Sequence, residues 1–109
     1  MNKIMYQEEI NTKFQDYVWL DFEFEFHGDD CIIQASKDLI YYTELEIRLI
    51  NVHKHGVITP DNSWRSTPNE VNAILKINVE NNLYKISFFN DDCDDIYFCC
   101  IDFTFKINN

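Results

Sequence analysis

Apolar and polar side chains alternate strictly over residues 17–26, and this alternation constrains the fold more than any other feature of the chain. Successive side chains of a strand point to opposite faces, so the segment predicts a strand with one core face and one acidic face. The core face would carry Val18, Leu20, Phe22, Phe24 and Phe26. The opposite face would carry Tyr17, Trp19, Asp21, Glu23 and Glu25.

A second short strand is expected to return from this one. The sequence His27-Gly28-Asp29-Asp30 is typical of a turn, and the alternation resumes over residues 31–35. The apolar faces of the two strands then lie on the same side of the hairpin, which supports the assignment. The expected pairing places Cys31, Ile33 and Ala35 opposite Phe26, Phe24 and Phe22.

The last third of the chain predicts a three-stranded meander. Residues 71–80 and 83–89 flank Asn81-Asn82, and Asn tolerates the left-handed backbone that a tight two-residue turn requires. The turn would pair Val79 with Tyr84, Ile77 with Ile86, and Leu75 with Phe88. After an acidic loop, residues 96–107 predict a final strand with a core face of Tyr97, Cys99, Ile101, Phe103, Phe105 and Ile107.

The middle of the chain divides into a strand and a loop. A turn at Ser36-Lys37-Asp38 leads into residues 39–52, whose long alternation and β-branched and aromatic residues predict a strand. A helix is the alternative there, because Leu, Glu and Arg are good helix formers. Residues 53–70 contain both prolines and one glycine and predict an irregular loop, the only locally basic part of the chain.

These segments together predict a mainly β fold in which residues 1–109 form a single domain. The architecture expected is an antiparallel curved sheet or half-open barrel of about six strands. Before the first strand, Ile4, Met5, Ile10 and Phe14 fit either one short N-terminal helix over the sheet or an edge strand. A chain of this length buries roughly two-thirds of its unfolded surface, which is enough for one core.

The charge of the chain excludes several function classes. The net charge is −10 with a pI near 4.5, which argues against direct binding of nucleic acid or of an anionic membrane. Only two glycines are present, so a glycine-rich phosphate loop is not expected. With three histidines and no local motif for nucleophilic catalysis, the sequence predicts a protein that is not an enzyme.

Neither a metal nor a cofactor is expected. An EF-hand loop that began at Asp91 would have Cys93, Ile96 and Asp102 at positions that need an oxygen ligand, a glycine and a glutamate. The adjacent Cys99 and Cys100 would point to opposite faces of a strand and could not bind one zinc ion together. With no signal-peptide pattern at the N-terminus, the cysteines are expected to be reduced and the protein cytoplasmic.

Acidic residues gather in two parts of the chain that contain no Lys or Arg. Residues 14–36 contain Asp16, Asp21, Glu23, Glu25, Asp29 and Asp30, and residues 86–105 contain Asp91, Asp92, Asp94, Asp95 and Asp102. Two interpretations stay open: a solvated face that keeps the protein soluble, and a docking surface for a basic partner.

In its small size, absence of a leader, strong acidity and alternating strands, the chain resembles the immunity proteins of bacterial toxin systems, including contact-dependent growth inhibition. The resemblance implies a protein that binds one cognate toxin, often a nuclease with a cationic cleft, and blocks its active site. Carboxylates would then pair with Lys and Arg of the toxin, and a Trp would be the apolar anchor. The candidate partner-binding residues are Trp19, Asp21, Glu23, Glu25, Asp29, Asp30, Glu44, Glu46, Trp64, Asp91, Asp92, Asp94 and Asp95.

Two other functions remain as alternatives. The first is a phage-encoded inhibitor that mimics nucleic acid, such as an anti-restriction or anti-CRISPR protein, which would use the same charge against a nucleic-acid channel. The second is a β-barrel that binds a small ligand in an apolar cavity. The oligomeric state also stays open, because an exposed edge strand can pair with a second copy or with a partner.

Overall fold

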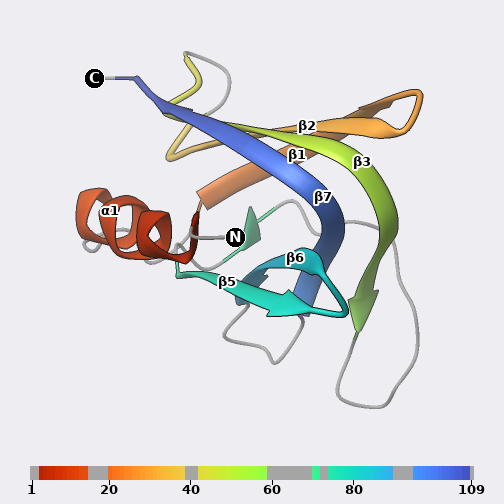
Figure 1. Cartoon of the computed structure of the whole chain (residues 1–109). Helices are drawn as coiled ribbons and strands as arrows, with labels where there is room; N and C mark the ends of the chain where they lie inside the picture. Colours follow the sequence, from red (N-terminus) through yellow and green to blue (C-terminus); the bar gives the residue numbers. More distant parts are fainter. Residues whose placement is uncertain are drawn as a thin grey trace.

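The strands that the structure describes all pair in one antiparallel sheet (Figure 1). The computed structural model describes residues 3–14, 20–38, 42–58, 70–71, 74–89 and 95–108. The strand order in the sheet is β4-β1-β2-β3-β7-β6-β5. The elements are η1 (Lys3–Met5), α1 (Tyr6–Lys13), β1 (Leu20–His27), β2 (Asp30–Ser36), β3 (Leu45–Ile58), β4 (Glu70–Val71), β5 (Leu75–Glu80), β6 (Leu83–Phe89) and β7 (Asp95–Ile107).

The sheet bends back on itself along its two longest strands, β3 and β7, which pair with each other. The half that contains β1 and β2 then faces the half that contains β5 and β6, with the core between them and α1 at the open side (Figure 1). Aromatic rings from the two halves meet there: Phe22 lies 5.2 Å from Phe88, and Phe24 lies 5.3 Å from Phe98, between ring centroids. The predicted mainly β fold with a curved antiparallel sheet is confirmed.

The first hairpin has the predicted register. Phe22 pairs with Ala35, Phe24 with Ile33, and Phe26 with Cys31. Gly28 has a φ of 66°, which is the left-handed conformation that a glycine adopts without strain in a two-residue turn.

The hairpin of β5 and β6 also has the predicted register, with Val79 opposite Tyr84. Asn81 and Asn82 both have positive φ, 52° and 65°, as a tight hairpin turn with the strand twist requires. The predicted start of this strand at Val71 is wrong. Val71 belongs to the separate two-residue strand β4, and β5 begins at Leu75.

The strand prediction for residues 39–52 is correct in type and wrong in its ends. The strand β3 begins at Leu45, because the chain before it is held in a connection that uses the buried carboxylate of Glu44. It ends at Ile58, so the irregular loop predicted from His53 onward is wrong for residues 53–58. This extension pairs with the first half of β7, whose backbone groups would otherwise lack a partner on that side.

The predicted core face of the last strand is correct for Tyr97 and in the second half of the strand. Tyr97 and Phe103 are buried, as expected, but Ile101 is 45% exposed, and Ile96, Phe98 and Cys100, which face the other side, are buried as well. The buried side chains of β7 therefore switch from one face of the strand to the other between Cys100 and Phe103. At the same level of the sheet Asn51 of β3 has a φ of 57°, and the register of β3 with β7 shifts by one residue after Val52, as at a β-bulge in a sharply bent pair of strands.

The N-terminal segment forms a helix, not an edge strand. Ile10 and Phe14 of this segment are buried in the core. The side-chain amide of Asn11 donates to the backbone oxygen of Leu75 at 3.0 Å and accepts from its N–H at 2.9 Å. One turn earlier, Oε1 of Gln7 accepts from the N–H of Ile77 at 2.8 Å. Helix α1 thus satisfies backbone groups at the outer edge of β5.

A second contact ties the N-terminus to the last strand. The Nζ of Lys3 lies 2.6 Å from Oδ1 of Asp102 and 2.6 Å from the backbone oxygen of Phe103, to both of which it donates. The hydrogen bond from Lys3 lowers the pKa of Asp102, and the N–H of Phe103 adds to the effect.

Replacing Asn11 by Ala tests the role of helix α1 at the β5 edge. The Asn11→Ala variant leaves the N–H and C=O of Leu75 without their side-chain partner, and we expect its free energy of unfolding to fall by about 1–3 kcal/mol. The measurement is urea unfolding. Thr12→Ala, at the exposed neighbouring position, is the control, and equal effects of the two substitutions would contradict this role.

Two substitutions of Asn82 in the turn of the second hairpin should change the stability of the protein in opposite directions. Asn82→Gly removes a side chain from a left-handed position and should raise the midpoint of thermal unfolding. Asn82→Val should cost about 1–2 kcal/mol, because a β-branched side chain is strained at positive φ. If Gly and Val at this position gave the same stability, the left-handed turn would be disproved.

Candidate functional site

The outer face of the first three strands brings carboxylates together from separate segments. Glu23 of β1 is the register partner of Gln34 of β2, which in turn pairs with Glu46 of β3. In the next row Glu25 pairs with Ile32. The apolar neighbours of these residues in sequence point into the core, so the alternation itself forces the carboxylates outward.

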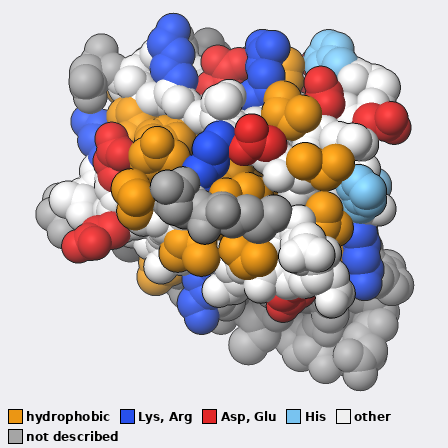
Figure 2. All heavy atoms as spheres, in the orientation of Figure 1, with side chains coloured by type: hydrophobic (Ala, Val, Ile, Leu, Met, Phe, Trp, Pro, Cys, Tyr) orange, Lys and Arg blue, Asp and Glu red, His pale blue; other side chains and the backbone are white. Residues whose placement is uncertain are grey.

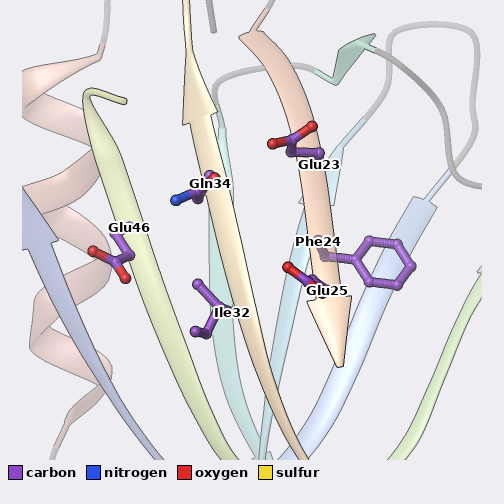
Figure 3. A pocket seen from close by; sticks show the side chains of 6 residues that line it. All are labelled: Glu23, Phe24, Glu25, Ile32, Gln34 and Glu46. Atoms are coloured by element: carbon purple, nitrogen blue, oxygen red, sulfur yellow. The ribbon is translucent and has the colours of Figure 1, made fainter. Parts of the chain in front are cut away.

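A groove of about 330 Å³ lies over these rows (Figure 3). The labelled carboxylates of Glu23, Glu25 and Glu46 stand over the strands with the amide of Gln34 between them, while the Phe24 ring points away. We call this feature the acidic groove; its lining residues are Glu23, Phe24, Glu25, Ile32, Gln34 and Glu46. Carboxylate and amide groups above one apolar side chain can accept hydrogen bonds from a cationic ligand, but they form no enclosed pocket.

The carboxylates of the acidic groove are largely uncompensated. Glu25 has one partner, His27, whose Nε2 lies 3.6 Å from Oε2 of Glu25. Within the described part of the chain, the side chains of Glu23 and Glu46 make no hydrogen bond or ion pair. Three like charges on one face repel one another, so a cation that docks there relieves an existing cost.

Positive charge is present on the same outer face, on β3 beside Glu46 and on β7. Arg48 of β3 is the register partner of Ile32, and Lys106 of β7 is the register partner of Glu46. A depression of about 140 Å³ is lined by both cations together with Glu46. The negative charge is therefore concentrated toward β1. The face in Figure 2, by contrast, carries side chains of both signs around an apolar area.

The structure groups some of the candidate residues and separates others. Asp21 precedes Glu23 and Glu25 on β1 and faces the same side, whereas Asp29 and Asp30 lie at the turn that ends this strand. Oδ1 of Asp30 accepts from the N–H of Asn51 at 2.9 Å, so this carboxylate also holds the bulge of β3. Outside the described residues lie Trp19, Trp64, Asp91, Asp92 and Asp94, and Asp95 is described only as the first backbone position of β7.

The expectation that Glu44 belongs to the exposed acidic surface is wrong. Glu44 is only 7% exposed, and its carboxylate accepts from the hydroxyl of Tyr42 at 2.6 Å and from the N–H of Lys37 at 3.2 Å. The same contact raises the pKa of Tyr42. The chain turns out of the strand alternation just before Leu45, so Glu44 serves the connection between β2 and β3.

The described cysteines do not form a reactive site. Cys31, Cys99 and Cys100 are free thiols. Burial raises the pKa of Cys31 to about 11 and that of Cys100 to about 12, and it also raises the pKa of Cys99. Thiols with these pKa values stay protonated near neutral pH and are poor nucleophiles.

Within the ranges that the structure describes, no three His, Cys, Asp or Glu side chains are placed to hold a metal ion. No helix in these ranges is long and apolar enough to span a membrane.

Sequence reasoning missed the position of His55. The extension of β3 carries this residue to β1, where its ring lies 4.7 Å from that of Phe26, and Phe26 is 37% exposed. An aromatic edge therefore borders the end of β1 beside the acidic groove. The predicted length of the last strand was a signal for the extension of β3. A strand over residues 96–107 leaves backbone groups unpaired unless its neighbour is of similar length.

No family model, curated protein or solved structure matches this chain.

Paired substitutions at Glu44 and Glu46 distinguish the buried carboxylate from the partly exposed one. Glu44→Ala leaves the N–H of Lys37 and the hydroxyl of Tyr42 without this acceptor and should lower the free energy of unfolding by about 1–3 kcal/mol. Glu46→Ala should change it by less than about 0.5 kcal/mol, as is usual for surface positions. Chemical denaturation measures both, and a larger effect at Glu46 would contradict the assignment.

Proposed function

We propose that this protein is a cytoplasmic inhibitor that acts by binding, and that it neutralises one basic protein partner in the way that immunity proteins neutralise a cognate bacterial toxin. The contact surface is the outer face of β1 with the acidic groove. One observation carries the proposal: the carboxylates of Glu23, Glu25 and Glu46 lie together on the strands of a sheet, and among the described residues only Glu25 makes an ion pair, with His27.

The acidic face acts on both the association and the orientation of the partner. A concentrated negative field attracts a basic protein before contact and raises the association rate by about 10- to 1,000-fold at low salt. The field also orients the partner, because Arg48 and Lys106, which lie beside Glu46, repel its cations from the β3–β7 side of the face. A nuclease is a suitable target, since its substrate cleft must be cationic to bind phosphates.

The packing of the interior supports an outer binding face over a ligand-binding barrel. The rings of Phe22 and Phe24 contact those of Phe88 and Phe98, so side chains occupy the space between the two halves of the sheet at this level. The nucleic-acid mimic uses the same acidic face, and only the identity of the partner separates it from the immunity function.

Charge reversal on β1 tests the proposal. The Glu23→Lys/Glu25→Lys variant should associate with the partner about tenfold more slowly or worse, because it converts the attractive field into a repulsive one. The partner is captured with tagged protein from the cells that encode it, and its association is measured at low and moderate salt. Wild-type binding should weaken as salt is added.

The control variant is Glu8→Lys/Glu9→Lys, which makes the same change in net charge at exposed positions of helix α1. It should bind much as the wild type does. Equal losses in both variants would show that only net charge matters, and unchanged binding of the β1 variant would refute the acidic-groove surface. Capture of a nuclease–nucleic-acid complex in place of a toxin would favour the mimic.

A further inference from the structure

The two ends of the sheet differ in how their edges are covered. At the β5 end, Asn11 and Gln7 of helix α1 bond the outer backbone groups of Leu75 and Ile77. At the β1 end, β4 pairs only with Leu20 and Asp21. Along residues 22–27 no described residue pairs with the outer side of β1. An edge strand with unpaired backbone groups is a template for a further strand.

The turn geometry identifies which backbone groups face outward. A two-residue turn closes on the hydrogen-bonded pair of His27 and Asp30, and hydrogen-bonded pairs alternate along an antiparallel ladder. Glu25 and Glu23 therefore bond to β2, while the N–H and C=O groups of Phe24 and Phe26 point away from it. The side chains of these two aromatic residues remain on the inner face.

We propose that the outer edge of β1 at residues 22–27 binds an extended strand of the basic partner by backbone pairing. This inference rests on the proposed function and specifies how the partner is held. The incoming strand carries Lys or Arg at alternate positions, on the side of Glu23 and Glu25. Cross-strand pairs of opposite charge stabilise such an arrangement by about 0.2–1 kcal/mol each.

The charge pattern excludes a second copy of this chain as the occupant. Antiparallel pairing of two β1 edges would set the carboxylates of Asp21, Glu23 and Glu25 against the same residues of the other copy. Like charges directly opposite each other destabilise a pair of strands. A basic strand has the complementary pattern.

The inner side of the same edge favours apolar residues between the cations. Phe26 is 37% exposed and contacts His55, and Phe24 beside it is half-buried. An added strand would set its inward side chains against these rings and bury them. The chemistry that fits the edge is therefore a strand that alternates basic and apolar residues.

Amide hydrogen exchange measured by NMR on the full chain tests the inference. In the free protein the amides of Phe24 and Phe26 should exchange rapidly, whereas those of Glu23 and Glu25 should be protected by β2. The probe is a short capped peptide that alternates Lys and Val. At saturation it should slow exchange at Phe24 and Phe26 by about tenfold or more, as expected for newly formed ladder hydrogen bonds.

Matched controls separate pairing from general attraction. A peptide of the same composition with all Lys before all Val should leave the two amides unprotected. Glu23→Lys/Glu25→Lys should abolish protection by the alternating peptide, and Glu8→Lys/Glu9→Lys should retain it. Protection of Phe24 and Phe26 in the free protein, or no slowing with the alternating peptide, would overturn the inference.

The outcomes also distinguish this inference from the proposed function. If a captured partner binds and responds to charge reversal but leaves Phe24 and Phe26 unprotected, the acidic face is the docking surface and strand addition is wrong. If the peptide protects both amides but no basic partner is captured, the edge is competent for pairing and the inhibitor function fails.

Discussion

A single sheet with one apolar face must find a cover for that face, and here the sheet covers itself. The paired strands β3 and β7 are long enough to run through both halves, and their bend brings the rings of Phe22 and Phe24 onto those of Phe88 and Phe98. The left-handed Asn51 and the register shift after Val52 produce the bend. Without it the two apolar faces would remain open to water.

This closure also determines where charge can lie. Once the inner faces meet, every alternate residue of β1 and β2 must face solvent, so the carboxylates of Glu23 and Glu25 are outside for the same reason that Phe24 is inside. The unpaired backbone groups at the two edges of the sheet are then covered in different ways. Helix α1 covers one edge with side-chain amides, and the two-residue strand β4 covers only the beginning of the other.

The sequence allowed correct prediction wherever a turn and the alternation specified the same pairing. Both hairpins have the expected register, because Gly28 and Asn81-Asn82 permit only a tight turn between alternating strands. Prediction failed at the bend, because alternation assumes a regular strand and a bulge moves every later side chain to the other face. Glu44 was misplaced for a related reason. Its position fits the strand alternation in the sequence, but β3 begins only at Leu45, so the Glu44 carboxylate belongs to the preceding connection and is buried.

The contact of Lys3 with Asp102 and Phe103 joins residues that are about a hundred positions apart. During synthesis the first helix leaves the ribosome long before the last strand exists, and β7 is the strand that pairs with both β3 and β6. The two halves of the sheet cannot be joined until that strand has been made. Proteins dominated by such distant contacts fold slowly, over milliseconds to seconds. This chain therefore spends its synthesis with apolar strands exposed, and its acidity keeps these chains apart during that time.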